Sequence, residues 1–128
     1  MAADAPTSDM AGRRVLVVED EPLIAMAVAA ALAEAGCALV GPTQTLSEAL
    51  RLAEEEQLDA AVLDRNLGGQ YSDPVAQRLR ERGIPFLIMT GYADPGLPLE
   101  FADVPSLAKP FEPDMLVTLV GRLFSSTD

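Results

Sequence analysis

With 128 residues, of which 49% are hydrophobic and 23% charged, the chain fits one ordinary globular domain. Its formal net charge of −11 argues against DNA or any other nucleic acid as a direct partner, because phosphate binding needs clustered Lys and Arg. The absence of histidine removes the commonest zinc ligand and general base, and the single cysteine excludes an intrachain disulfide.

Residues 1–12 show no hydrophobic periodicity and are rich in Ala, Asp, Ser and Pro, so we expect a flexible N-terminal tail. This stretch does not have the layout of a signal peptide. The longest apolar run, Leu23–Ala33, has about half of the ~20 residues that a membrane span needs. We therefore expect a cytoplasmic protein with no membrane partner.

From Arg13 onward, short apolar runs alternate with stretches of helical spacing. The pattern predicts strands at 13–18, 38–41, 59–64, 84–89 and 105–108. It predicts helices at 22–35, from 47 to about 57, from 74 (after a cap at 72 or 73) to 83, and from 113 onward. Such alternation is typical of a doubly wound α/β fold with a five-stranded parallel sheet in the flavodoxin-like order 2-1-3-4-5. We place this domain at residues 13–124 and a C-terminal tail at 125–128.

The segment between the last two predicted strands, 91–104, is the irregular part of this pattern. It contains Pro95, Gly96 and Pro98, which break helices. We therefore expect the fourth helix, which would lie here, to be short or irregular, displaced, or absent.

Polar and charged groups follow four of the predicted strands where each strand ends. Glu19 and Asp20 follow the first strand, and Asp64 ends the third. Because the carboxyl ends of parallel strands meet at one edge of a sheet, we expect these carboxylates to lie close together. Their mutual repulsion favours either a raised pKa or a bound cation. Carboxylate oxygens, together with the backbone carbonyl of Asn66, suit Mg²⁺.

Thr90 and Lys109 follow the fourth and fifth predicted strands at the same edge. Lys109 supplies a fixed positive charge, and Thr90 a small hydroxyl donor. A tetrahedral oxyanion group on Asp64 would therefore meet metal, hydroxyl and ammonium together. A carboxylate can itself act as a nucleophile and form an aspartyl phosphate. The alternative for any single group is a solvated strand end.

Four short motifs occur in a specific order and spacing: Val18-Glu19-Asp20-Glu21-Pro22, Leu63-Asp64-Arg65-Asn66, Met89-Thr90-Gly91 and Leu107-Ala108-Lys109-Pro110-Phe111. With these motifs, the chain resembles the CheY-like receiver domains of bacterial two-component response regulators, from Arg13 to about Phe124. The resemblance implies that Asp64 is the phosphoacceptor. It also implies that Thr90 and Lys109 bind the phosphoryl oxygens.

The same resemblance implies a magnesium site. Asp20 would be a direct ligand together with Asp64, Glu19 would act mainly through water, and Asn66 would offer its backbone carbonyl. In this family the bond from the lysine to the following proline is cis, which would apply to Lys109-Pro110.

One position departs from the family pattern. Receiver domains usually carry Tyr or Phe in the fifth strand, three residues before the lysine, and here that residue is Ser106. The usual switch, in which this aromatic ring turns inward on phosphorylation, cannot operate with a serine.

Tyr92 is a candidate replacement for this ring. The stretches 85–92, 66–69 and 71–74 resemble the FATGUY subgroup of receivers, whose members are often stand-alone receivers paired with HWE-type histidine kinases. We hypothesise that Tyr92 and the 91–98 loop become ordered over the phosphorylated site. The alternative is a surface tyrosine in a mobile loop.

Two further features allow more than one interpretation. Arg65 could place an exposed guanidinium where it reaches a phosphoryl oxygen or a kinase carboxylate, or it could be a solvated loop residue. The first helix is apolar nearly all round, from Leu23 to Leu32. It could be a docking surface for the phosphohistidine helices of the kinase or a homodimer contact, or its alanines could simply be tolerated in water.

The expected function is that of a stand-alone phosphoacceptor, because the chain ends a few residues after the last predicted helix. A histidine kinase or a phosphotransfer protein would supply the phosphoryl group. Output would come from protein contact or from service as a phosphate sink, and the domain would not be a turnover enzyme.

Two alternatives stay open. A phosphohydrolase of the haloacid-dehalogenase type would need a second Asp two residues after the nucleophile, where this chain has Asn66. A pseudo-receiver that serves only as an interaction module would not need the complete set of acceptor-site residues that this chain carries.

Overall fold

The computed structural model describes residues 10–91 and 96–125. Its main sheet has five parallel strands: β1 (Arg14–Val18), β2 (Ala38–Thr43), β3 (Ala60–Asp64), β6 (Phe86–Thr90) and β7 (Ser106–Ala108). Their order across the sheet is β2-β1-β3-β6-β7. This confirms the predicted 2-1-3-4-5 order and the doubly wound α/β fold.

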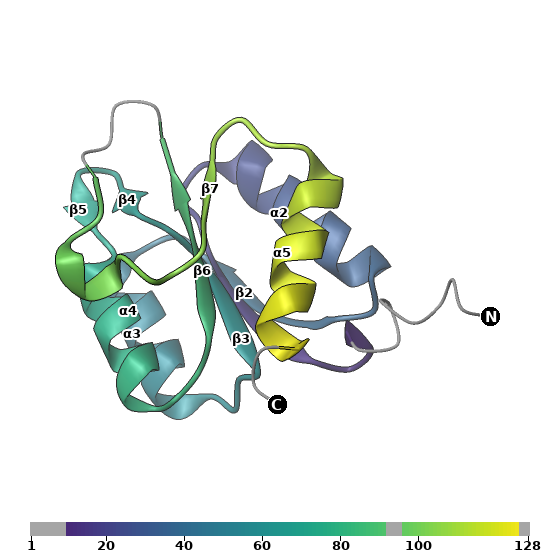
Figure 1. The fold of residues 1–128 in the computed structure, drawn as a ribbon, viewed down its shortest axis with the longest axis horizontal. Coiled ribbons are helices and arrows are strands. Elements are labelled where there is room, and N and C mark those ends of the chain that lie inside the picture. Colours follow the sequence, from purple (N-terminus) through teal and green to yellow (C-terminus); the bar gives the residue numbers. More distant parts are fainter. Residues whose placement is uncertain (1–9, 92–95, 126–128) are drawn as a thin grey trace.

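Two pairs of helices cover the two faces of the sheet (Figure 1). Helices α2 (Pro22–Glu34) and α5 (Pro113–Ser125) pack on one face, and α3 (Leu46–Glu55) and α4 (Asp73–Glu81) pack on the other. Within the described part of the chain, none of the helices is long and apolar enough to cross a membrane.

The side chains of β1 show how the two layers of the core are built. Val15 and Val17 join the layer formed with α2 and α5, whereas Leu16 and Val18 join the layer formed with α3 and α4. All four are fully buried, as expected for alternating side chains in a sheet that is covered on both faces. Burial of one such side chain contributes about 1.5–3 kcal/mol. The central strands therefore give a rigid base to the residues at their ends.

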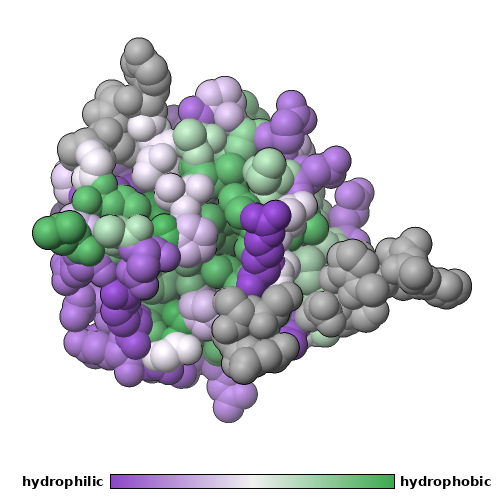
Figure 2. Space-filling view, in the orientation of Figure 1, coloured by the Kyte–Doolittle hydropathy of each residue, from purple (hydrophilic) through white to green (hydrophobic). Residues whose placement is uncertain are grey.

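Between β6 and β7, the structure describes one helical element, the short 3₁₀ helix η2 (Leu99–Phe101). This confirms the prediction of a short or irregular fourth helix. Phe101 anchors the turn, because its ring is buried and meets the ring of Phe86 edge-on, with the centroids 6.2 Å apart. Leu99, in contrast, is 91% exposed, and Figure 2 shows apolar side chains on this side of the molecule, at the left of the view.

A small second sheet lies directly after β3 and was not predicted. Strand β4 (Asn66–Leu67) pairs antiparallel with β5 (Gln70–Tyr71). Gly68 and Gly69 form the turn between them, with φ values of 63° and 98°. Two consecutive positive φ angles match the hairpin turn that favours glycine. A Cβ atom at Gly68 would lie 3.5 Å from Oδ2 of Asp20, so this turn lies beside the acidic pair that follows β1.

Met10 lies in the stretch for which we predicted a flexible tail, yet its side chain is buried in the layer formed with α2 and α5. The turn that follows is tied to the end of α2, because the N–H of Gly12 donates to the carbonyl oxygen of Gly36 at 2.8 Å. The guanidinium carbon of Arg13 lies 4.8 Å from the centre of the Phe124 ring. The packed part of the chain therefore includes residues 10–12.

Candidate functional site

The groups predicted to meet at the carboxyl edge of the sheet do lie together. One oxygen from each of Glu19, Asp20 and Asp64 lies within 4.8 Å of the others. The ammonium nitrogen of Lys109 lies 2.8 Å from Oε1 of Glu19 and 3.2 Å from Oδ2 of Asp64. The peptide bond between Lys109 and Pro110 is cis. The structure thus joins three carboxylates and the only lysine of the sequence in one cluster.

The end of β2 holds Glu19 in place. This strand was predicted to end at Gly41, but it continues to Thr43 with a shift of register against β1. The carbonyl oxygen of Thr43 accepts a hydrogen bond of 3.0 Å from the N–H of Glu19. The Glu19 carboxylate in turn accepts a bond of 3.0 Å from the N–H of Glu21 and is fully buried. The irregular end of β2 is therefore part of the site.

Asp64 and Asn66 are linked by the sharp bend between β3 and β4. The N–H of Asn66 donates to Oδ1 of Asp64 at 3.3 Å, and Asp64 is only 3% exposed. The side-chain oxygen of Asn66 accepts a bond of 2.7 Å from the N–H of Gly69 within the hairpin. The metal ligand predicted from the sequence is the backbone carbonyl of Asn66 and not this side-chain oxygen.

The electrostatics of the cluster reflect crowding of like charge. Burial, followed by hydrogen bonding and repulsion from Glu19, raises the pKa of Asp64 to about 8, although Lys109 acts in the opposite direction. For Lys109, burial alone would lower the pKa, but Glu19 and Asp64 together outweigh burial and raise it. Lys109 therefore stays charged, while the carboxylates lack a full balance of positive charge.

The acidic cluster fits a magnesium ion on the chemistry of its donors. Three carboxylates face one ammonium group, so an excess of negative charge remains that a divalent cation would balance. Oε1 of Glu19 is buried and accepts no hydrogen bond of good geometry from the described residues, so it relies on the ion pair with Lys109. The donors are all oxygens, which Mg²⁺ prefers.

Thr90 lies at the end of β6, half-buried, and its carbonyl oxygen accepts a bond of 2.8 Å from the N–H of Lys109. Ser106 begins β7, where it pairs with Ile88, and its side chain is exposed. Both residues line a cavity of about 430 Å³ together with Gly91, Gly96, Leu97, Ala102 and Val104. A serine is too small to fill this space. Tyr92, the predicted replacement for the missing ring, lies outside the described residues.

Both interpretations of Arg65 as an exposed residue are wrong. Arg65 is 4% exposed, and its guanidinium forms an ion pair with Asp73 at the start of α4. The β4–β5 hairpin and the start of α4 fold over it, which the sequence pattern did not reveal. Tyr71 and Asp73 were the available signal, because an aromatic ring and a carboxylate are the usual partners of a buried arginine.

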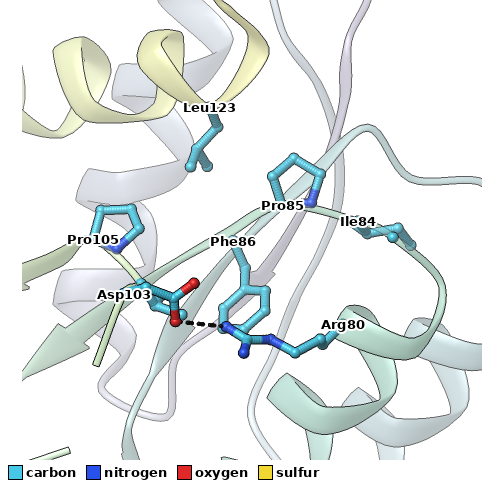
Figure 3. Close-up of a pocket in the computed structure, with 9 residues that line it drawn as sticks. Arg80, Ile84, Pro85, Phe86, Asp103, Pro105 and Leu123 are labelled. Atoms are coloured by element: carbon cyan, nitrogen blue, oxygen red, sulfur yellow. Dashed lines mark hydrogen bonds and ion pairs between the residues drawn. The ribbon is translucent and has the colours of Figure 1, made fainter. Parts of the chain in front are cut away.

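A second pocket, of about 340 Å³, lies at the opposite edge of the sheet. It is lined by residues at the amino ends of β6 and β7, among them Pro85 and Pro105, and by Leu123 (Figure 3). At its rim, Nη2 of Arg80 lies 3.1 Å from Oδ1 of Asp103. Because it lies at the other end of the strands, this pocket takes no part in the acidic cluster.

Known protein sequences are similar to this chain over most of its length. The family model of the response regulator receiver domain matches residues 15–121. The phyllosphere-induced regulator PhyR of Methylorubrum extorquens is 34% identical over 119 residues, which are 90% of this chain and 44% of PhyR. The chain spans about half the length of the curated relatives that it matches.

Two solved structures share the fold. SdrG from Sphingomonas melonis Fr1 is 42% identical, with a TM-score of 0.78 over 88% of this chain and 96% of SdrG. The receiver domain of the sensor histidine kinase PA1611 from Pseudomonas aeruginosa PAO1 is 25% identical, with a TM-score of 0.75 over 90% of this chain and 99% of that domain. The PA1611 structure holds a magnesium ion coordinated in its active-site cleft.

Proposed function

The chain belongs to the response regulator receiver family, and on this premise we propose that it takes part in a two-component phosphorelay with Asp64 as the phosphoacceptor. Receiver domains are phosphoacceptor signalling domains and not turnover enzymes, so we do not retain the phosphohydrolase alternative. The observation that best supports the proposal is the contact of Lys109 with both Asp64 and Glu19 inside a cluster of three carboxylates.

We propose that Asp20, Asp64 and the backbone carbonyl of Asn66 hold Mg²⁺, with Glu19 acting mainly through water. The all-oxygen donor set supports this assignment, as does the magnesium ion in the cleft of the PA1611 receiver domain. When bound, the cation would balance the carboxylates and the oxygens of the incoming phosphoryl group.

Phosphoryl transfer would then use Asp64, Lys109 and Thr90 at the ends of the strands. A carboxylate oxygen of Asp64 attacks the phosphorus of a phosphohistidine on the donor protein, so that an O–P bond forms while the P–N bond breaks and its electron pair leaves with the histidine nitrogen. The ammonium of Lys109 and the hydroxyl of Thr90 bind the phosphoryl oxygens. Because Glu19 holds Lys109 beside Asp64, this positive charge is positioned before the donor arrives.

We propose further that the donor, a histidine kinase or a phosphotransfer protein, docks on the exposed face of α2. This helix begins just after the acidic pair, and Leu23 and Met26 in its first turns are 79% and 66% exposed. Exposed apolar patches of this kind mark interaction surfaces. Self-association through the same face, giving a homodimer, is the alternative that the mass in solution would reveal.

The docking proposal can be separated from the chemistry of the site. In the double variant Leu23→Ser/Met26→Ser, we expect phosphotransfer from the donor protein to slow severalfold, because apolar contact area is lost. Uptake from a small acyl phosphate should stay at the wild-type rate, since such a donor does not need α2. Equal slowing with both donors, or no slowing with either, would argue against docking on α2.

Several finer assignments stay predictions: the FATGUY subgroup, the HWE type of the kinase, the replacement of the missing ring by Tyr92, and a cytoplasmic location. We propose that the phosphorylated chain acts by protein contact or as a phosphate sink. Residues 13–124 are the unit that we propose to carry these activities.

The central test is incubation with Mg²⁺ and a small acyl phosphate, followed by measurement of the intact mass. We expect the wild-type chain to gain one phosphoryl group, and Asp64→Asn to gain none because the nucleophile is lost. Asp114→Asn, at an exposed position on α5, is the matched control and should behave as the wild type. No gain in the wild-type chain, or an undiminished gain in Asp64→Asn, would refute the proposed function. Removal of the metal with a chelator should stop the reaction.

A further inference from the structure

Arg65 follows the proposed phosphoacceptor directly, but the phosphotransfer chemistry assigns it no part. Its side chain is 5% exposed, which is rare for an arginine. A buried guanidinium needs partners for its charge and for its five N–H groups. The three partners of the Arg65 guanidinium come from two segments of the chain, 71–73 and the stretch at Gly96.

The first partner is Asp73, at the start of α4. Nε of Arg65 lies 3.2 Å from Oδ1 of Asp73, and Nη2 lies 3.3 Å from Oδ2. Two parallel bonds of this kind fix the plane of the guanidinium as well as its position. The ring of Tyr71 on β5 lies against the same group, with its centre 4.6 Å from Cζ. The guanidinium is therefore held rigidly by the chain between β5 and α4.

The third partner of the guanidinium, after Asp73 and Tyr71, is Gly96, which lies far away in the sequence. Nη1 of Arg65 donates to the carbonyl oxygen of Gly96 at 3.0 Å, across 31 residues. The backbone of Arg65 adds two more connections: its N–H donates to Met89 on β6 at 2.9 Å, and its carbonyl accepts from Ser72 at 2.8 Å. Arg65 thus joins the end of β3 to β6, to the start of α4 and to the chain at Gly96.

The chain at Gly96 is packed on one side only, because Gly96 is exposed while its neighbour Leu97 packs against the core layer formed with α3 and α4. Gly96 and Leu97 form one wall of the cavity of about 430 Å³ whose other walls include Thr90 and Ser106. A large side chain at position 106 could fill this space, but a serine cannot. The bond from Arg65 therefore adds to the packing of Leu97 as a restraint on the wall beside Thr90.

We propose that Arg65 is a positioning residue for phosphorylation of Asp64. Its paired bonds to Asp73 and its bond to Gly96 hold the chain next to Thr90 in the arrangement in which the phosphoryl oxygens are bound. The inference rests on the proposed function. The role is geometric, since a misplacement of about 1 Å near reacting groups can slow a reaction by about 100-fold.

Three single variants separate the geometry of Arg65 from its charge. Arg65→Lys keeps the charge but loses the paired bonds, Arg65→Met keeps the length but loses the charge, and Asp73→Asn leaves Arg65 intact but weakens its main partner. Arg51→Lys is the matched control, because Arg51 also forms ion pairs, with Glu48 and Glu55, but lies exposed on α3. The rate of phosphoryl uptake from a small acyl phosphate is measured by intact mass at saturating Mg²⁺. The dissociation constant for Mg²⁺ and the unfolding midpoint are measured separately.

We expect all three variants to take up the phosphoryl group about tenfold more slowly than the wild-type chain, with unchanged affinity for Mg²⁺. The double variant Arg65→Lys/Asp73→Asn should be no slower than the slower single variant, because both changes break the same connection. Arg51→Lys should match the wild type. If Arg65→Met does not fold, Asp73→Asn decides the question, since Asp73 is partly exposed.

Other results would overturn the inference. Wild-type rates in all three variants would show that the connection is not needed. A wild-type rate in Arg65→Lys with slow uptake in Arg65→Met would assign the effect to charge and not to position. Slow uptake that only follows weaker binding of Mg²⁺ would also contradict it. A wild-type chain that gains no phosphoryl group would refute the proposed function, and this inference with it. If the wild type and all three variants gain the group at the same rate, only this inference is refuted.

Discussion

Among single residues, Lys109 shows why a lysine suits this site better than an arginine. Every other basic residue of the chain is an arginine, yet the site at the sheet edge carries the one lysine. A compact ammonium group can contact Glu19 and Asp64 at the same time and still present a donor to a phosphoryl oxygen. A planar guanidinium would instead favour two parallel bonds to one carboxylate. The single lysine is therefore suited to a site in which one cation serves several anions.

We expect Lys109→Met to unfold more easily than the wild-type chain at neutral pH without Mg²⁺. Removal of one partner from a buried ion pair leaves an uncompensated charge and costs about 3–5 kcal/mol. Urea unfolding would measure the loss, with Arg122→Met, at an exposed position on α5, as the control. Added Mg²⁺ should recover part of the stability, because it balances the same carboxylates. A wild-type midpoint in Lys109→Met without Mg²⁺ would argue against this account of the ion pair.

Among the elements, β2 contributes to the site through its irregular end. Gly41 has a φ of +94°, and a Cβ atom there would lie 2.8 Å from the carbonyl oxygen of Val17 and 2.9 Å from the nitrogen of Thr43. Only glycine allows the strand to continue in this conformation to Thr43, whose carbonyl holds the backbone of Glu19. An edge strand thus determines where a buried carboxylate lies.

Gly41→Ala should destabilise the fold more than a positive φ angle alone can explain. Gly83→Ala is the matched control, because Gly83 has a φ of +72° but a Cβ atom added there would meet nothing within 4 Å. We expect Gly83→Ala to cost about 1 kcal/mol, and Gly41→Ala to cost about 2–3 kcal/mol more because two backbone atoms must move. Urea unfolding of both variants would measure the difference. Equal costs would show that β2 adjusts without strain.

At the scale of the whole molecule, local patterns predicted the sheet order and the edge at which the site lies. Apolar runs that end in single polar groups, such as the one before Asp64, are sufficient for this because strand direction and order follow from the alternation with helices. The features that were missed depend on contacts between distant parts of the chain. Arg65 is buried by Gly96 and by a hairpin whose strands have two residues each, too short to show a period. Met10 is buried only because α2 and α5 meet beside it.

The stability of the whole fold should depend on metal binding, because the acidic residues lie at the ends of the central strands β1 and β3. β1 and β3 pair in register up to Val18 and Leu63, so the fold brings Glu19 and Asp64 together whether or not a cation is present. The pKa of Asp64 is raised to about 8, first by burial and then by Glu19. An acid whose pKa is higher in the folded than in the unfolded state loses stability as the pH rises from its unfolded value through its folded value. At neutral pH the cluster without metal therefore opposes folding.

This coupling predicts opposite effects of one variant with and without the metal. Without Mg²⁺ at neutral pH, Asp64→Asn should be more stable than the wild type, because the amide is neutral in both states whereas the ionised Asp64 of the unfolded chain must bind a proton or enter the crowded cluster as a charge on folding. With Mg²⁺ at about 100 times its dissociation constant, the wild-type chain should gain about 2.7 kcal/mol, whereas Asp64→Asn has lost a ligand and should gain much less. Asp114→Asn, which is exposed on α5, should gain as much as the wild type. Urea unfolding with and without Mg²⁺ would measure all three chains. An equal gain in Asp64→Asn would place the cation away from Asp64, because a ligand that binds elsewhere stabilises both chains alike.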